Sequence, residues 1–516
     1  MTDRLATYAP RQGAVQSNPL GHWLAIAGIA ALALALQFGA YPNHDVAWIL
    51  WGTRELLQGA AWGRDIIEPN PPLAWYIAMP STWLADLLGL PLAAVFQLAV
   101  GGAALLSIAA FGAFARQASG VADGNSRLPM LVAALVLLLL ASRDFGQREH
   151  LALIAVLPYV GLVALRCQAR SVTMATALAI GVAAGLGVAL KPYFLAVPLL
   201  VEVTALLIVE RWAFALRAET AAIAGTIGIY VLSLILVDRD YLTEVVPLAR
   251  SIYWSFNLPW ETVIAPLAPS LAVAAFAGIV AWPRRLVLPL LLVAAVIGFA
   301  LSCIVQHKGY SYHVYPVLAA ALIEVAVLLA SPALTKPLRG GAMIMLALLA
   351  LQGSAITARW WRLNAPDGQR TLETRALIEA IDRHAGKGRF LAVAVHPFPA
   401  FPTALYVDAT QVSRTNSQWF LPAVIQLRAQ GAKADRALLA SAEHNARAFI
   451  LRDLARAPDL VILDRDSARH TISAGSFDFL AFYREDPRFR AAWASYREIA
   501  PVSHYRLFVR RREASQ

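Results

Sequence analysis

Three stretches between long apolar runs concentrate the side chains that do chemistry. The first is a long loop that begins with Asp45 and continues through Asp65 and Glu68. The second, Arg143–His150, places two arginines, two acids and a histidine within eight residues. The third, Gln306–Pro316, mixes histidines and a lysine with tyrosines. A connector that only reverses the chain needs none of these groups, so the three stretches are candidates for a polar site.

Carboxylates and cations in one site can serve the transfer of a group between oxygen atoms. A carboxylate takes the proton from an attacking hydroxyl, and cations stabilise negative charge on the group that leaves. Each residue also has a structural alternative. Lys191 can snorkel at a helix end, Arg143–His150 can form an internal salt-bridge network, and the tyrosines around His307 suit a membrane-interface belt.

The histidines and cysteines do not predict a metal centre. His150, His307 and His313 contain no helical i, i+4 pair of ligands. Cys167 and Cys303 lie at or within apolar runs and form no CxxC pattern, so we expect two inert thiols. We therefore expect no cofactor and no metal site, and a role for a divalent ion at the acids is left open.

The polar stretches must be positioned by a bundle of membrane helices. Of the 516 residues, 59% are hydrophobic and 15% are charged, whereas a soluble chain has roughly 45–50% apolar and about 25% charged residues. The apolar residues form eleven runs near the length that crosses a bilayer, and only a helix satisfies its own backbone there. We place these spans at 23–40, 91–114, 129–142, 151–166, 172–190, 192–209, 219–237, 263–282, 286–305, 314–331 and 341–358.

Charge asymmetry predicts the orientation of the bundle, because Lys and Arg concentrate in cytoplasmic loops. The first apolar run is long and follows a long leading segment, so we expect a retained span rather than a cleaved signal peptide. With an odd number of spans, the three polar stretches and residues 359–516 face outward, into the periplasm of a Gram-negative host. The loops expected to be cytoplasmic contain Arg4, Arg11, Arg116, Arg127, Arg166, Arg170, Arg211, Arg217, Arg284, Arg285, Lys336 and Arg339.

The tail beyond the last span has the pattern of a small folded domain. Its apolar runs shorten to strand length and alternate with helical stretches. We therefore predict a transmembrane domain over 1–358 and a soluble α/β domain over 359–516, a comfortable single-domain size. The expected strands are 389–395, 404–407, 460–463 and 505–509, and the expected helices are 371–384 and 432–457.

These features together resemble the GT-C superfamily of membrane glycosyltransferases, especially the protein O-mannosyltransferases and the lipid A aminoarabinose transferase. An acid after the first helix, a Gly-x-Asp stretch and a Pro-Pro-Leu motif match Asp45, Gly63–Asp65 and Pro71–Leu73 in order and approximate spacing. Lys191-Pro192 at the start of a later helix also matches. The resemblance covers roughly the first two hundred residues. One departure is Asn70, where relatives often have a lysine that contacts phosphate.

The resemblance implies an inverting transfer of a sugar from a polyprenyl-phosphate donor to a lipid-linked or cell-envelope glycan, at the outer face of a bacterial inner membrane. Asp45 is then the general base, and Asp65 and Glu68 are further catalytic candidates. The predicted phosphate ligands are Lys191, Arg148, Arg143 and Lys308. The predicted substrate-binding residues are Asp144, Glu149, His150, His307, Tyr312 and His313. The other expected partners are membrane lipids, and nucleic acid is not expected because the basic residues are dispersed.

Other function classes are compatible with parts of the sequence. Glu202 and Glu324 fall well inside two spans, where a charge costs about 2.5–3.5 kcal/mol on insertion scales, so a transporter or flippase of lipid-linked sugars is the main alternative. No internal repeat and no paired broken helices support it. A polymerase of lipid-linked glycans is closer in kind to the main prediction. A membrane-anchored binding protein leaves the chemistry of the loops unexplained.

Overall fold

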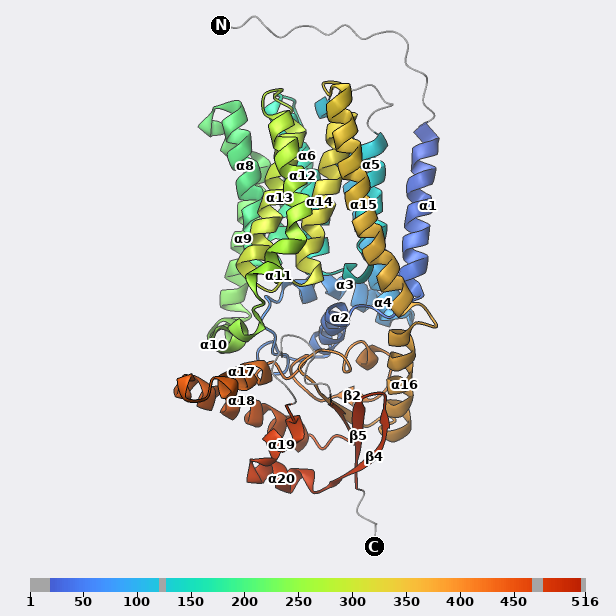
Figure 1. Ribbon diagram of the computed structural model, residues 1–516, viewed down its shortest axis with the longest axis vertical. Helices are drawn as coiled ribbons and strands as arrows, with labels where there is room; N and C mark the ends of the chain where they lie inside the picture. Colours follow the sequence, from blue (N-terminus) through green and yellow to red (C-terminus); the bar gives the residue numbers. More distant parts are fainter. Residues whose placement is uncertain (1–18, 120–126, 466–476, 512–516) are drawn as a thin grey trace, which may run out of the picture.

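The computed structural model describes residues 19–119, 127–465 and 477–511. A bundle of long helices forms one end of the molecule, and a mixed α/β region forms the other end (Figure 1). Arg4 and Arg11, which entered the orientation argument, lie outside the described residues. The fold is that of a multi-pass membrane protein with a C-terminal α/β region, as the sequence predicts.

Nine helical segments of the described chain are long and apolar enough to cross a membrane. Each coincides with a predicted span. The α8 segment begins with a 3-10 turn from Pro192, and the α12 segment begins with the short helix α11 (Trp260–Ile264). The main helices are α1 (Pro19–Phe38), α4 (Leu92–Ser119), α6 (Arg148–Cys167), α8 (Ala196–Val209), α9 (Ala218–Leu236), α12 (Ala268–Ala281), α13 (Val287–Gln306), α14 (Ser311–Ala330) and α15 (Lys336–Asn364).

The two remaining predicted spans are helical but shorter. They are α5 (Arg127–Ala134), which continues as a π-helical turn over Leu135–Leu139, and α7 (Met174–Ala189). Small residues let α7 approach its neighbour closely, as in many membrane bundles. A Cβ atom added at Gly181 would lie 2.5 Å from the backbone oxygen of Glu219. The predicted boundary after residue 358 falls inside α15, which continues into the last turns before the α/β region.

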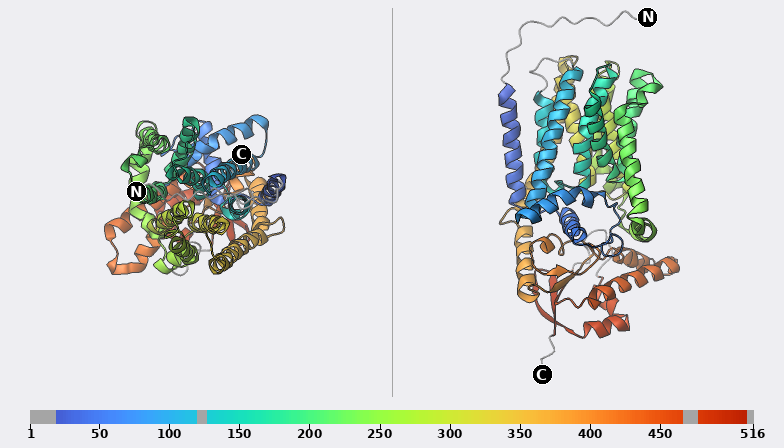
Figure 2. Two further views of the ribbon diagram at one scale, coloured as in Figure 1. Left: turned by 90° about the horizontal axis from the view of Figure 1, so that it is seen from above. Right: turned by 180° about the vertical axis from the view of Figure 1, so that it is seen from behind.

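A layer of short helices separates the bundle from the C-terminal region (Figures 1 and 2). It contains α2 (His44–Leu57) and α3 (Leu73–Leu88) from the first loop, and α10 (Val246–Ile252). The tryptophans of α2 are buried: Trp48 is 1% exposed, and its ring centroid lies 5.1 Å from that of Phe401 in the C-terminal region. This layer therefore joins the two ends of the molecule.

The C-terminal region contains a five-stranded sheet with the order β2-β1-β3-β5-β4. Strand β1 pairs in parallel with β2 and β3, and β5 pairs antiparallel with β3 and β4. The predicted strand at 404–407 is wrong, because Thr403–Leu405 form a 3-10 turn, and β4 was not predicted because its residues are mostly exposed. The bounds are α16 (Gln369–His384), β1 (Arg389–Val393), β2 (Thr410–Gln411), α17 (Leu421–Gln430), α18 (Arg436–Ala455), β3 (Leu460–Asp464), α19 (Phe479–Arg484), α20 (Pro487–Trp493), β4 (Tyr496–Val502) and β5 (Tyr505–Arg510).

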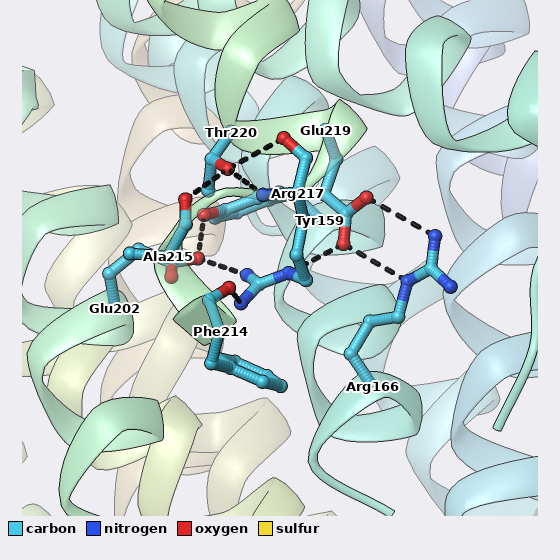
Figure 3. Close-up of polar contacts among 8 residues, drawn as sticks. All are labelled: Tyr159, Arg166, Glu202, Phe214, Ala215, Arg217, Glu219 and Thr220. Carbon is cyan, nitrogen blue, oxygen red and sulfur yellow. Dashed lines mark hydrogen bonds and ion pairs between the residues drawn. The ribbon is translucent and has the colours of Figure 1, made fainter. Parts of the chain in front are cut away.

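A network of ion pairs ties three helices together at the end of the bundle that lies farthest from the C-terminal region (Figure 3). Arg217, just before α9, donates to Glu202 of α8 over 2.5 Å and to Glu219 of α9 over 2.7 Å. Arg166 of α6 also donates to Glu219, with Nε 3.1 Å from Oε1. Tyr159 donates its hydroxyl to Glu202. Glu202 is therefore held by two partners inside the bundle.

Candidate functional site

A cavity of about 310 Å³ lies where the layer of short helices meets the C-terminal region. We call it the central cavity. It brings together residues from all three polar stretches of the sequence, because the loops that contain them lie at the same face of the bundle. Its lining includes Asp45, Glu68, Asn70, Arg143, Arg148, Tyr310 and Tyr312 from the membrane part, with His396, Asn416, Ser417 and Trp419 from the C-terminal region.

Asp45 lies in the first turn of α2 and is fixed from two sides. Its backbone N–H donates to the side chain of Asn43, the N-cap residue of α2, over 2.9 Å. Gln147 donates from Nε2 to Asp45 Oδ2 over 3.1 Å. Burial acts to raise the pKa of the Asp45 carboxyl, but His44, Arg148 and Gln147 outweigh it and hold the pKa below its usual value. Asp45 is therefore an ionised, oriented carboxylate in the cavity.

Two arginines line the central cavity without a bonded partner. Arg148 is 3% exposed, and its buried Nε has no hydrogen-bond partner. Within the described residues, the side chains of Arg148 and Arg143 make no hydrogen bond or ion pair. A buried guanidinium with unmade hydrogen bonds is costly unless an anion completes them. The cavity therefore has the donors for a phosphate or another anion close to Asp45.

Glu68 forms the wall of the central cavity beside Asp45. Its Oε2 accepts from Trp48 Nε1 over 2.9 Å and from Asn416 Nδ2 over 3.4 Å, and Asn70 donates to its Oε1. Burial raises the pKa of the Glu68 carboxyl, against the smaller opposing effects of Arg148 and Asn70. Glu68 is therefore largely occupied by protein donors, and it links the first loop to the C-terminal region.

A second cavity, of about 930 Å³, adjoins the central one. We call it the apolar cavity. It shares Pro69, Asn70, Tyr253, Tyr310 and Tyr312 with the central cavity. Farther out it is lined by exposed aliphatic side chains of α9 and α13 in the bundle, and of α10 and the π-helical turn before it. These include Val231, Leu242, Val246 and Val305.

Lys191 and His313 line the apolar cavity and share one carboxylate. Lys191 Nζ lies 2.6 Å from Glu149 Oε1 and 3.1 Å from Gln306 Oε1. His313 Nε2 lies 3.5 Å from the same oxygen of Glu149. Lys191 is 4% exposed, and Glu149 is 1% exposed. Lys191 is thus already neutralised, so it can contact a phosphate only together with Glu149 or in exchange for it.

Lys308 lines the apolar cavity without an acidic partner in the described residues. Its Nζ donates to the backbone oxygen of Tyr253 over 2.6 Å and to Asn257 Oδ1 over 2.8 Å. The ammonium also lies 4.5 Å from the centre of the Tyr253 ring. Burial lowers the pKa of Lys308 to about 8. An anion at this point of the cavity would restore the protonated form, since an opposite charge favours it.

Several predicted site residues lie outside the central cavity. Asp65 pairs with Arg64, 2.9 Å away, on the partly exposed loop. His150 accepts from the Gly146 N–H and lies 2.8 Å from the Leu137 oxygen, so it braces the turn before α6. Burial raises the pKa of Asp144 to about 7, and its Oδ1 accepts from Ser311. His307 lines the apolar cavity and stacks on Trp260 at 3.8 Å.

The sequence did not predict the residues that the C-terminal region adds to the cavity. His396 follows β1, and Asn416 and Ser417 follow β2, so all three lie beyond the carboxyl ends of parallel strands. Ligands commonly bind at this edge of a parallel sheet. The contact is secured by the Ile67 N–H, which donates to the Arg414 oxygen over 2.8 Å. No local motif marks these positions.

Among the described residues, no group of three or more His, Cys, Asp or Glu side chains is arranged to hold a metal ion. A comparison of the sequence with protein-family models and with curated proteins finds no match.

Proposed function

We propose that this chain is a membrane glycosyltransferase that takes a sugar from a polyprenyl-phosphate donor and passes it to a glycan acceptor. The observation that carries the proposal is the junction of the two cavities. A large apolar cavity shares part of its lining with a smaller, more polar one that holds an oriented carboxylate, Asp45, and the unpartnered Arg148. The apolar cavity suits a lipid tail, the junction suits a phosphate, and the polar cavity suits a sugar.

The donor is placed with its tail in the apolar cavity and its phosphate at the junction. Lys308 and the Lys191–Glu149 pair lie along the path, and Arg148 and Arg143 lie at its inner end. Cations at these positions neutralise the phosphate as it departs. In this proposal, these cations take the place of the lysine that the resembled family often has where this chain has Asn70.

The transfer then needs one proton acceptor. The acceptor hydroxyl oxygen attacks the anomeric carbon, and its proton passes to the carboxylate of Asp45. The bond between that carbon and the phosphate oxygen breaks, and its electron pair leaves with the polyprenyl phosphate. Attack from the side opposite the phosphate inverts the anomeric configuration. The cavity faces the C-terminal region, which we place on the outer side of the membrane, in the periplasm of a bacterial cell.

Transport of a lipid-linked sugar is the second candidate, and Glu324 is the observation that favours it. This residue of α14 is 0% exposed, and neither of its carboxyl oxygens has a hydrogen-bond partner. Buried carboxyls in membrane spans often relay protons. Glu202, the other acid considered for transport, is held by Arg217 and Tyr159. The polar cavity at one face of the bundle favours the enzyme.

The decisive experiment supplies the full-length protein in lipid nanodiscs with radiolabelled polyprenyl-phosphate sugars and membrane lipids of the source cells. Movement of label to a new product, with release of polyprenyl phosphate, supports transfer. Donor binding without any product, followed by donor movement across a proteoliposome membrane, would support transport instead. Loss of that movement in Glu324→Gln would complete the case for transport.

Lys308 predicts a pH dependence of donor binding. Its pKa is lowered to about 8, so the ammonium is present at neutral pH and is lost as the pH rises through 8. Affinity for polyprenyl phosphate should therefore fall as the pH rises above 8, by at most about tenfold per pH unit for one linked proton. Binding is measured from pH 6.5 to 9.5 in the wild type and in Lys308→Met. The variant should bind more weakly and lose this fall, and a fall that persists in it would contradict the assignment.

A further inference from the structure

A third cavity, of about 420 Å³, adjoins the central cavity on a different side. We call it the side cavity. It lies among the segment that follows α1, the junction of α15 with α16, and the loop after β1. It shares His44, Arg143 and His396 with the central cavity, and it shares no residue with the apolar cavity. The central cavity, with Asp45, therefore lies between the other two.

The lining of the side cavity differs in chemistry from that of the apolar cavity. Its apolar surface comes mainly from aromatic rings and prolines, including Tyr41, Trp360 and Phe398, rather than from aliphatic chains. Amide side chains, including Asn43 and Gln369, lie among these rings. Flat aromatic faces beside hydrogen-bonding groups suit a ligand that presents both C–H faces and hydroxyls.

The C-terminal region contributes a large part of the lining of the side cavity, beside the end of α15 and the segment after α1. Gln369 and Thr374 belong to α16, and His396 and Phe398 belong to the loop that follows β1. Tyr41 is held in place by Tyr406 of the C-terminal region, with the ring centroids 4.9 Å apart at 83°. A ligand here is therefore contacted by the C-terminal region together with the segment after α1 and the last turn of α15.

We propose that the side cavity binds sugar residues of the acceptor and presents a hydroxyl to Asp45. The inference rests on the proposed function, and it assigns the acceptor to the side of Asp45 opposite the lipid donor. The donor phosphate then leaves toward the apolar cavity as the acceptor oxygen arrives from the side cavity. The shared residues His44 and His396, whose rings pack with their centroids 4.3 Å apart, lie where the two cavities meet.

The proposal is tested by filling the side cavity. Gln369 is exposed within it, and Gln369→Trp places a large ring in the space for sugar. Gln430→Trp makes the same change at an exposed position of α17 that lies outside the three cavities. Arg370→Ala is a milder second variant at an exposed lining position, should Gln369→Trp not fold. The probes are oligosaccharides released from the lipid-linked glycans of the source cells, and the same glycans still attached to lipid.

Binding of each probe is measured by saturation-transfer NMR on the full-length protein in nanodiscs, without donor. We expect Gln369→Trp to weaken glycan binding by about tenfold or more, equivalent to the loss of a few good contacts, while Gln430→Trp binds as the wild type does. Equal binding by the two tryptophan variants overturns the assignment, as does an unchanged affinity in Arg370→Ala when Gln369→Trp does not fold. Binding of free oligosaccharide identifies the sugar chain as sufficient, and binding of the lipid-linked form alone shows that a glycolipid headgroup is the source.

A parallel measurement keeps the two proposals separable. In the transfer assay, Gln369→Trp should raise the acceptor KM while leaving polyprenyl-phosphate binding within about twofold of the wild type, as expected for a change outside the donor site. Glycan binding that depends on Gln369 in a protein that transfers nothing would leave the side cavity assigned and the glycosyltransferase proposal wrong. Equal transfer by the two tryptophan variants would support the glycosyltransferase proposal and show that the assignment of the side cavity is wrong.

Discussion

Replacing Asp45 by asparagine should abolish most of the transfer while leaving the protein folded and able to bind donor. The amide has nearly the same shape and can still contact Gln147, which now donates to Asp45 Oδ2 over 3.1 Å. It cannot take a proton from the acceptor hydroxyl. A positioned general base contributes roughly 10²–10⁴-fold to a rate, so kcat should fall by about that factor.

The measurement is the rate of label transfer at saturating donor, beside the affinity for polyprenyl phosphate. The pKa of Asp45 is held below its usual value, so the wild-type carboxylate is ionised throughout the neutral range. Its contribution to the rate should be lost only as the pH falls through that lowered pKa.

Asp65→Asn is the matched control for this change. Asp65 belongs to the same loop, but it pairs with Arg64 away from the central cavity. It should change kcat by no more than a few-fold, as expected for a surface ion pair worth ~0.2–1 kcal/mol. Equal losses in the two variants, or full activity in Asp45→Asn, would remove Asp45 from the role of base.

Arg217→Met should have the largest effect on stability. Arg217 donates to both Glu202 and Glu219, and the side chain of Glu219 is 0% exposed. Removing one partner of a buried ion pair leaves charge without compensation and typically costs about 3–5 kcal/mol. Arg166 and Tyr159 still contact the two acids, so we expect a value near the lower end. The measurement is SDS-induced unfolding in mixed micelles.

The control for Arg217 is Arg211→Met in the same connector. Arg211 is exposed, and its side chain forms no ion pair within the described part of the chain, so its loss should change the free energy of unfolding by less than about 0.5 kcal/mol. The double variant Arg217→Met/Glu202→Gln should recover part of the loss, because one of the stranded charges is gone. Unfolding of Arg217→Met at the same SDS concentration as Arg211→Met would contradict the role of the network.

The bundle was predictable because the thickness of a bilayer sets the length of the apolar run that a membrane-spanning helix needs. Every predicted span contains a helix. The helix α3 was missed because its 16 residues, although apolar, sit inside a polar loop and contain Pro80. The alternation of strands and helices revealed the C-terminal α/β region, but not the exposed strand β4, whose burial pattern carries little apolar periodicity.

The candidate site was predictable only where topology alone brings residues together. Asp45, Glu68 and Arg148 meet because their loops end at one face of the bundle. His150 was predicted to bind substrate, and the structure shows its ring in the first turn of α6 in contact with backbone atoms, which no local motif indicates. Asn416 bonds Glu68 across a separation of 348 residues, and no spacing in a single sequence announces such a contact.

The residues that follow β1 and β2 and line the central cavity also determine when that cavity is completed during synthesis of the protein. Asp45 and Arg148 are in place once the early spans have inserted, but His396 and Asn416 are made hundreds of residues later. They reach the cavity only after the C-terminal region has been made and β1 has paired with β3. A nascent chain still attached to the ribosome at the last span therefore has an incomplete central cavity, and the transfer that we propose could not begin before the C-terminal region is made.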